Sequence, residues 1–207
     1  MSDVLKALLT ALLCLAAVPA LAGKYNSKLS IGDAAPEWKE LPGTDGKKHS
    51  LGDLKDKEVI VVAFTCNTCP YAVDVEDRLI ALAKKLSADG KGALVAINSN
   101  KVPDDLLPAM EKRAKAKSFN FPYLHDESQQ VARDFGATYT PEFVVLNKDR
   151  KVVYLGALDD SPDGKKVTKK YVEDAVAAAL AGKTLAVAET PAVGCAVRYV
   201  KERRKRE

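Results

Sequence analysis

One segment constrains the fold of this chain more than any other: an apolar run that leads directly into two closely spaced cysteines. Residues 58–64 (EVIVVAF) are rich in β-branched side chains, as expected of a strand buried on both faces. Cys66 and Cys69 follow at once, and apolar residues recur at helical spacing over 71–88. The sequence therefore predicts two thiols at the point where a buried strand ends and a helix begins.

The rest of the chain continues this alternation of strands and helices. The last two predicted strands are separated only by a turn, so they form an antiparallel hairpin, whereas the earlier ones need helical crossovers. The sequence therefore predicts an α/β fold with a central mixed β-sheet and helices on both faces, preceded by loops and a short hairpin around Asp45-Gly46. The further strands are expected at 93–97, 121–124, 142–146 and 151–155, and the further helices at 104–118, 127–135 and 166–181.

The first 22 residues are expected to be a targeting signal. Lys6 precedes a continuous apolar run over 7–18, Pro19 interrupts the run, and residues 20–22 (Ala-Leu-Ala) supply the small side chains of a cleavage site. The run is shorter than the about 20 apolar residues of a membrane-spanning helix. We expect cleavage after Ala22, an exported protein of the periplasm or another extracytoplasmic compartment, and no integral membrane span afterwards. An uncleaved N-terminal anchor is the alternative.

Charge is concentrated at the C-terminus. Residues 198–207 contain six basic and two acidic side chains, which account for the whole net charge of +4. A neutral body with a short basic tail gives no support to a nucleic-acid-binding function. With 47% apolar and 29% charged residues in 207, the chain has the composition of one globular domain.

The cysteine pair predicts reversible dithiol–disulfide exchange. Two cysteines three positions apart can close a small disulfide across the first turn of a helix, and Pro70 stiffens that turn without the loss of a hydrogen bond. We expect Cys66 at the helix N-terminus, where free amides and the helix dipole lower the pKa of a thiol. A lowered pKa raises the thiolate fraction and makes the sulfur a better leaving group.

Three other uses of a cysteine pair fit this sequence less well. Structural zinc needs four ligands, and beyond the pair the mature chain offers only Cys195, His49 and His125. Attachment of c-type haem needs a histidine directly after the pair, and Pro70 excludes it. A purely structural disulfide gains most from closing a long loop, and this one closes almost none.

The residues between 31 and 198 resemble the thioredoxin-like redoxins, in the branch of alkyl hydroperoxide reductase-type and TlpA-like thiol–disulfide proteins. The likeness covers most of the chain after the signal, and the block around the cysteines is similar to that of a bacterial subgroup of exported or cytosolic members. The motifs that carry it are IGDAAP (31–36), GK (46–47), LGDL (51–54), FTCNTCPYAVDVEDRL (64–79), INSN (97–100), FPYLHDESQQVARDFGATYTPEFVVLN (121–147) and GC (194–195).

This resemblance implies a thioredoxin-like domain over 23–188 with an N-terminal extension, followed by a C-terminal segment, 189–207. It implies that Cys66 attacks and Cys69 resolves. It also implies that Pro141 is a cis-proline that faces the disulfide, and that Thr140 offers its backbone to an extended client strand. The expected partners are protein or small-molecule thiols and disulfides and a redox partner not specified by the sequence, with no cofactor, no metal and no nucleic acid. The helix start is expected to be formed by Thr65, Asn67, Thr68 and Pro70.

The chain departs from thioredoxin proper around the cysteines. Thr65 stands where thioredoxin has tryptophan, and Asn67-Thr68 replaces Gly-Pro. Ile60 occupies the strand position of a buried acid, so the sequence does not identify a proton acceptor for Cys69.

Two alternative functions follow from the same residues. The enzymatic one is a thiol peroxidase, which passes through a sulfenic acid. Peroxiredoxins place a threonine three residues before the reactive cysteine. In this chain that position holds Ala63 before Cys66 and Cys66 before Cys69, so the peroxiredoxin motif is not met. The other is a copper-binding carrier that uses Cys66, Cys69 and His125.

Cys195 leaves an odd number of cysteines after the signal. It is a candidate third redox thiol, either as a second resolving cysteine or as an intermolecular link. The alternative is a small apolar side chain packed in the interior, as many free cysteines are.

Overall fold

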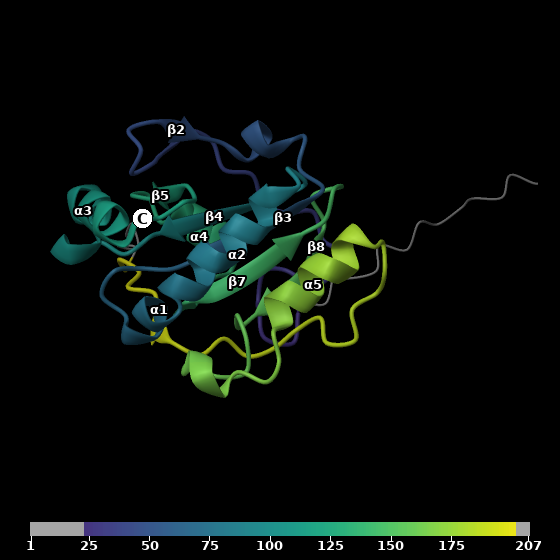
Figure 1. The fold of residues 1–207 in the computed structure, drawn as a ribbon. Helices are drawn as coiled ribbons and strands as arrows, with labels where there is room; N and C mark the ends of the chain where they lie inside the picture. The colour runs from purple at the N-terminus through teal and green to yellow at the C-terminus, as the bar shows by residue number, and fades with distance from the viewer. Residues whose placement is uncertain (1–22, 202–207) are drawn as a thin grey trace, which may run out of the picture.

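The computed structural model describes residues 23–201, and Figure 1 shows a twisted sheet at their centre. The sheet has five strands in the order β5-β4-β3-β7-β8. The first three pair in parallel and the last two antiparallel, which confirms the predicted mixed sheet and its hairpin. The bounds are β3 Val59–Phe64, β4 Gly92–Asn98, β5 Tyr123–His125, β7 Glu142–Leu146 and β8 Val152–Gly156.

The central strand β3 is buried along its whole length. Its side chains alternate between two apolar cores, because successive residues of a strand point to opposite faces. Val59 and Val61 belong to the core under helices α2 (Glu76–Ala88) and α5 (Tyr171–Leu180), whereas Ile60 and Val62 belong to the core on the other face. This explains why residues 58–64 lack the apolar–polar alternation of a half-exposed strand.

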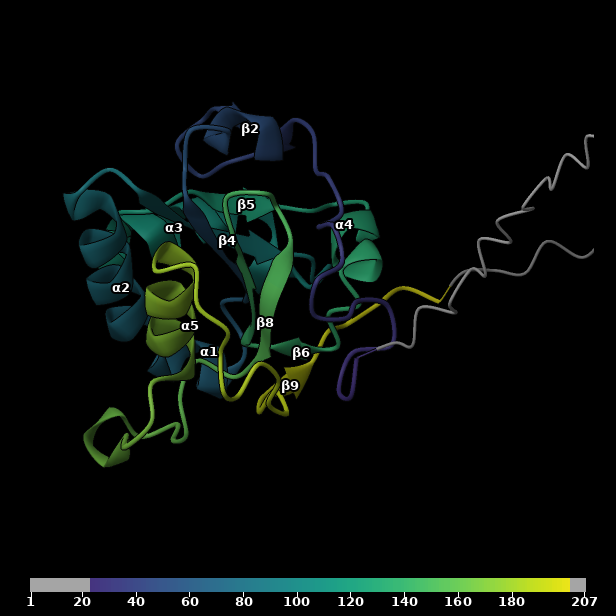
Figure 2. The same cartoon turned by 90° about the vertical axis from the view of Figure 1, so that its right-hand side faces the viewer.

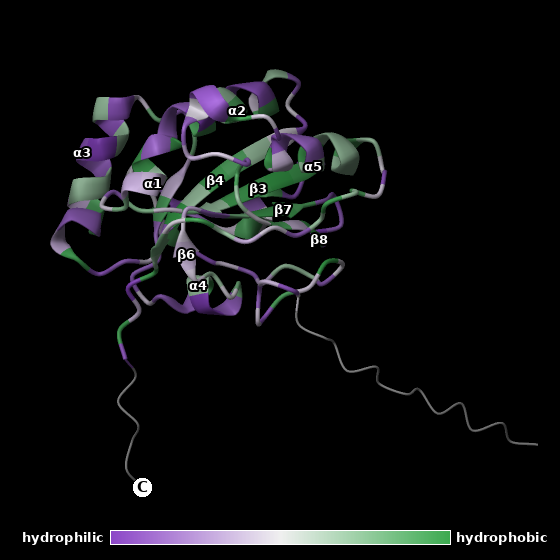
Figure 3. Ribbon diagram, turned by 90° about the horizontal axis from the view of Figure 1, so that it is seen from below, coloured by the Kyte–Doolittle hydropathy of each residue, from purple (hydrophilic) through white to green (hydrophobic). Residues whose placement is uncertain are grey.

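Helices cover both faces of the sheet, as Figures 2 and 3 show. Helices α2, α3 and α5 place apolar residues in one core, and α4 packs on the opposite face together with the segment before β3. In Figure 3 the strands are mostly hydrophobic and the exposed sides of the helices hydrophilic. The helices are α1 Pro70–Asp74, α2 Glu76–Ala88, α3 Leu107–Lys117, α4 Gln130–Asp134 and α5 Tyr171–Leu180.

All four predicted helices differ in extent from those observed, and the one expected over 127–135 is shortened to α4, Gln130–Asp134. The helix expected over 71–88 is divided at Val75, whose ψ of −6° interrupts the hydrogen-bond ladder between α1 and α2. The helix expected over 104–118 begins at 107, because a 3₁₀ turn at Pro103–Asp105 is followed by extended backbone at Leu106. The helix expected from 166 begins at 171, after another short 3₁₀ turn.

Two small antiparallel pairs complete the fold. β1 (Leu41–Pro42) and β2 (Lys48–His49) form the predicted short hairpin. β6 (Tyr139–Thr140) pairs with β9 (Cys195–Ala196), a long-range contact that the sequence did not predict. Figure 2 shows these two strands side by side at one end of the sheet.

The expected targeting signal and its cleavage site lie outside the described residues, as does most of the basic tail. Between residues 23 and 201, none of the helices is both long and apolar enough to cross a membrane.

Candidate functional site: three thiols beside a cis-proline

The cysteine pair lies immediately after β3, at the carboxyl edge of the sheet. Both sulfur-bearing residues are nearly enclosed, with Cys66 3% and Cys69 2% exposed. Helix α1 starts at Pro70, and Cys69 is its N-cap. The expectation that Cys66 occupies the helix N-terminus is therefore wrong, because the backbone of Cys69 is still extended. Of the residues expected to form the helix start, Pro70 does so, whereas Thr65, Asn67 and Thr68 precede the helix.

The segment before β7 closes over this pair. The Thr140–Pro141 peptide bond is cis, and Thr140 contacts both thiols. The Thr140 Oγ1 lies 3.3 Å from Cys66 Sγ, and Cys69 Sγ donates to the Thr140 carbonyl oxygen at 2.9 Å. The antiparallel register of the sheet, which aligns Phe64 with Glu142, brings these distant segments together.

A buried carboxylate, Asp105, organises the two residues between the cysteines. Asp105 Oδ1 accepts the backbone amides of Asn67 at 2.7 Å and Thr68 at 3.2 Å. Its Oδ2 accepts the Thr68 hydroxyl at 2.7 Å and the side-chain amide of Asn100 at 3.0 Å. Sequence reasoning missed this residue. The available signal was its place shortly after β4, because the carboxyl ends of adjacent parallel strands meet at one edge.

Asn67 is fixed by its side chain as well. Its Nδ2 donates to the Asp104 carbonyl oxygen at 2.7 Å, and its Oδ1 accepts the Tyr123 hydroxyl at 3.0 Å. Burial raises the pKa of Tyr123 well above its usual value, so this hydroxyl remains a donor. The dipeptide that replaces Gly-Pro is therefore held from two neighbouring elements, and the turn between the cysteines is rigid.

The two cysteines have opposite pKa shifts. Burial raises the pKa of Cys66, and the nearby Asp105 charge adds to the rise, against hydrogen bonds from Thr140 and backbone amides. Burial also opposes ionisation of Cys69, but hydrogen bonds from Cys195, the Ala72 amide and the Thr140 side chain outweigh it and lower the pKa of Cys69. Sequence reasoning placed the lowered pKa on Cys66. The structure places it on Cys69, because Cys69 has the better set of donors.

Cys195 is the third member of this cluster. It packs against Cys66, Cys69 and Ala72, and all three cysteines are free thiols. The neighbouring Cys69 sulfur, together with burial, raises the pKa of Cys195 to about 11. Ile60 in β3 carries no acid, so the polar groups that act on Cys69 come from Ala72, Thr140 and Cys195 rather than from the strand.

The histidines do not join the thiols. His125 ends β5 and is buried, and its Nε2 has no hydrogen-bond partner. His49 instead contacts Asp45, 3.0 Å away. Across the part of the chain that the structure describes, no three His, Cys, Asp or Glu side chains are grouped to hold a metal ion. The structure therefore does not assemble the Cys66, Cys69 and His125 set of a copper carrier, nor a zinc site.

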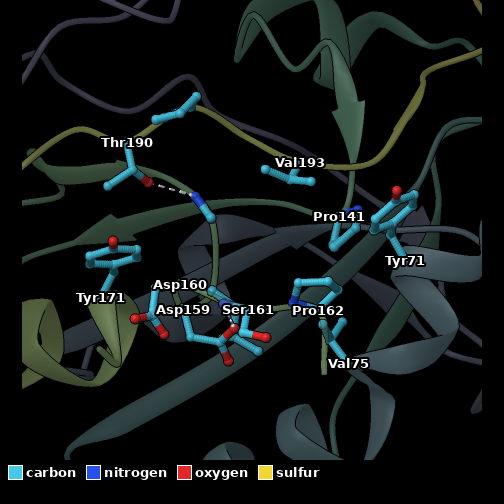
Figure 4. A pocket seen from close by; sticks show the side chains of 13 residues that line it. Tyr71, Val75, Pro141, Asp159, Asp160, Ser161, Pro162, Tyr171, Thr190 and Val193 are labelled. Carbon is cyan, nitrogen blue, oxygen red and sulfur yellow. Dashed lines mark hydrogen bonds between the residues drawn. The ribbon is translucent and has the colours of Figure 1, made fainter. Parts of the chain in front are cut away.

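A cavity of about 250 Å³ adjoins the cis-proline (Figure 4). Tyr71 in α1 and Val75 directly after it line one side of the cavity, and Pro141 and Val193 line the side nearer the cysteines. Its rim is held by Thr190, whose Oγ1 accepts the Ala157 amide at 3.0 Å, the contact dashed in Figure 4. The site therefore has one open, largely apolar wall.

The redoxin family model matches residues 30–176, which is most of the chain and includes both cysteines of the pair. The chain belongs to the redoxin family. No curated protein matches this redoxin.

Two solved structures share about a third of the residues of this redoxin. One is a hypothetical protein from Sinorhizobium meliloti, 32% identical, with a TM-score of 0.78 and coverage of 86% of this chain and 98% of that one. The other is an uncharacterized conserved protein from Geobacillus kaustophilus, also 32% identical, with a TM-score of 0.79 and coverage of 86% and 96%.

A more distant structure identifies the fold. A thiol:disulfide interchange protein of the thioredoxin family from Chlorobium tepidum is 21% identical, with a TM-score of 0.57 and coverage of 73% of this chain and 99% of that one. At this identity the likeness concerns the fold alone. This redoxin has the thioredoxin-like fold that its sequence predicted.

Proposed function

We propose that this redoxin is a thiol–disulfide oxidoreductase that exchanges a Cys66–Cys69 disulfide with client thiols and disulfides. One observation carries the proposal: both thiols contact Thr140, next to the cis-proline, at 3.3 Å and 2.9 Å. Two sulfurs gathered in a rigid turn can form and break a disulfide with little movement of the chain. Such a pair is suited to exchange rather than to stabilisation of the fold.

In the reducing direction, the Cys66 sulfur attacks one sulfur of a client disulfide. A mixed disulfide forms, the client disulfide breaks, and the released client sulfur takes the proton that Cys66 gave up. Cys69 then attacks the Cys66 sulfur, which forms the Cys66–Cys69 disulfide and releases the second client thiol. The lowered pKa of Cys69 supports this second step, because it provides the attacking thiolate. The same steps in reverse oxidise client thiols.

The test is disulfide mapping combined with trapping. The reduced full-length protein is equilibrated with glutathione buffers, alkylated, and read by peptide mass, so that Cys66 and Cys69 are each observed separately. We expect a Cys66–Cys69 disulfide, and a Cys69→Ser variant that accumulates a mixed disulfide with a model client on Cys66. A Cys66→Ser variant should trap much less. Full exchange activity in both variants would exclude this mechanism.

The same preparations test the thiol peroxidase alternative. Rapid consumption of a hydroperoxide with a sulfenic acid on one cysteine, and no exchange with disulfides, would replace our proposal by that one. We expect slow consumption instead, because the residues three positions before Cys66 and Cys69 are Ala63 and Cys66 rather than the threonine of a peroxidase.

We also propose that the protein works outside the cytoplasm. The proposal rests on the pattern of residues 1–22, with its apolar run and small cleavage residues. Expression in a bacterial host, followed by fractionation and N-terminal sequencing, should yield a chain that starts at Gly23 in the exported fraction. A chain that retains its first residues and stays in the cytoplasm would contradict this.

A further inference from the structure

The edge on which a client strand was expected is occupied by the protein's own C-terminal segment. Thr140 pairs with Cys195 in the β6–β9 ladder, and the Val197 amide donates to the Thr138 carbonyl oxygen at 2.9 Å. The Thr140 backbone is therefore already paired, and an external strand cannot take this place while β9 is there. Cys195 stands where the cysteine of an extended client would stand.

Gly194 allows this close approach. A Cβ at this position would lie 2.1 Å from the Thr140 carbonyl oxygen, which is far inside van der Waals contact and involves backbone rather than a flexible side chain. Only glycine lets the segment come near enough for Cys195 to reach the pair. The close approach to Thr140 thus explains why a glycine precedes Cys195.

The segment is fixed on both sides of Cys195. Before it, the Thr190 amide donates to the Leu155 carbonyl oxygen at 3.0 Å, and the Thr190 Oγ1 lies 2.6 Å from the Tyr154 hydroxyl. After it, residues 198–200 are hydrogen-bonded to groups that follow β4 and flank α4. These later bonds are Arg198 N to Asn100 Oδ1 at 2.9 Å, Val200 N to Gln129 Oε1 at 2.8 Å and Tyr199 OH to Ala137 O at 2.6 Å.

We infer that Cys195 is a relay thiol, by which we mean a thiol that passes oxidation from the Cys66–Cys69 disulfide to clients. It does so by forming a disulfide with Cys69, which a client thiol then attacks. This inference rests on the proposed function. Cys195 already packs against the cluster that holds Cys66 and Cys69, and it is the least buried of the three cysteines. Cys66 and Cys69, by contrast, are almost enclosed beneath Thr140 and the segment itself. Clients therefore meet Cys195 first.

The relay step needs no reactant other than the protein and its client. The Cys195 sulfur attacks Cys69 in the oxidised pair, so a Cys69–Cys195 bond forms as the Cys66–Cys69 bond breaks. The proton lost by Cys195 goes to the departing Cys66 sulfur, which becomes a thiol. A client thiol then attacks Cys195 and releases Cys69, and a second client thiol frees Cys195. The client becomes a disulfide, and the protein returns to three thiols.

The first test isolates the relay bond. A full-length Cys66→Ser variant is treated with oxidised glutathione and mapped by peptide mass, which also reads Cys14 separately. Most molecules should carry a Cys69–Cys195 disulfide within one chain. Cys69 and Cys195 left free or separately glutathionylated would overturn the inference.

The second test measures client oxidation by the oxidised protein, with a reduced protein substrate as the probe. Cys195→Ala should retain the Cys66–Cys69 disulfide and lose about tenfold or more in the rate of client oxidation. An unchanged rate would overturn the relay and leave the proposed function intact. Failure of the wild type to form Cys66–Cys69 at all would instead remove the proposed function.

A matched pair of glycine variants tests the docking of the segment. Gly194→Ala should reduce formation of the Cys69–Cys195 disulfide in the Cys66→Ser background, because of the contact with Thr140. Gly52→Ala is the control, since a Cβ there meets nothing within 4 Å. Equal disulfide yields in the two folded variants would contradict the docking geometry. If Gly194→Ala does not fold, the Cys195→Ala rate still decides the question.

Discussion

Asp105 offers the most informative single substitution near the turn between Cys66 and Cys69. Its two carboxylate oxygens accept four hydrogen bonds, from the amides of Asn67 and Thr68, the Thr68 hydroxyl and the Asn100 side chain. Its charge also raises the pKa of Cys66. Asp105→Asn keeps the shape of the side chain and removes the charge, so it separates the two roles of this residue.

The effect on stability follows from the contacts. Asparagine keeps one acceptor oxygen for the two backbone amides, but it points an NH₂ group at the NH₂ of Asn100, which is buried. A buried donor without an acceptor costs about 1–3 kcal/mol. Weaker bonds to a neutral acceptor add to this, so we expect a loss of about 2–3 kcal/mol in the free energy of unfolding. Each kcal/mol corresponds to about 2–4 °C in Tm for a chain of this size.

The effect on Cys66 has the opposite sense. Removal of a negative charge near a thiol favours its ionisation, so the pKa of Cys66 should fall even as the protein becomes less stable. Urea unfolding of the reduced protein measures stability, and the pH dependence of alkylation at Cys66, read by peptide mass, measures the pKa. The control is Asp104→Asn, whose side chain is exposed. A Cys66 pKa equal to or above that of the wild type would refute this reasoning.

Two further predictions address other contacts of the described chain. Arg113 makes a bidentate ion pair with the buried Glu76, through two bonds of 2.8 Å. Arg113→Ala should therefore lower the free energy of unfolding, measured in urea, by about 3 kcal/mol. The control, Lys112→Ala at an exposed position, should change the free energy of unfolding by less than about 0.5 kcal/mol. Similar values for both variants would show that the ion pair contributes little. Cys195→Ala removes a hydrogen-bond donor from Cys69, so the pKa of Cys69 should rise and its ionisation should move to higher pH. Thiolate absorbance measures this pKa. An unchanged pKa would show that the other donors to Cys69 suffice.

The sequence was most informative where local patterns determine structure. The β-branched run before the cysteines predicted β3, because a strand buried on both faces must be apolar at every position. The hairpin at the end of the sheet followed from two such runs and a turn. Helix ends were predicted less well, since Val75 and Leu106 interrupt helices through backbone angles that their side-chain types do not specify.

The sequence by itself determined the α/β architecture and the placement of Cys66 and Cys69 at a strand–helix junction. Both features depend on residues that are adjacent in the chain. Only the tertiary structure decided which thiol has the lowered pKa. That property depends on donors from Cys195 and Thr140, which are distant in sequence. The same holds for Asp105, whose carboxylate reaches the cysteine turn only because β3 and β4 lie side by side in parallel. Hydrogen bonds and burial act over a few ångströms in space, and the chain brings such groups together only when it is folded.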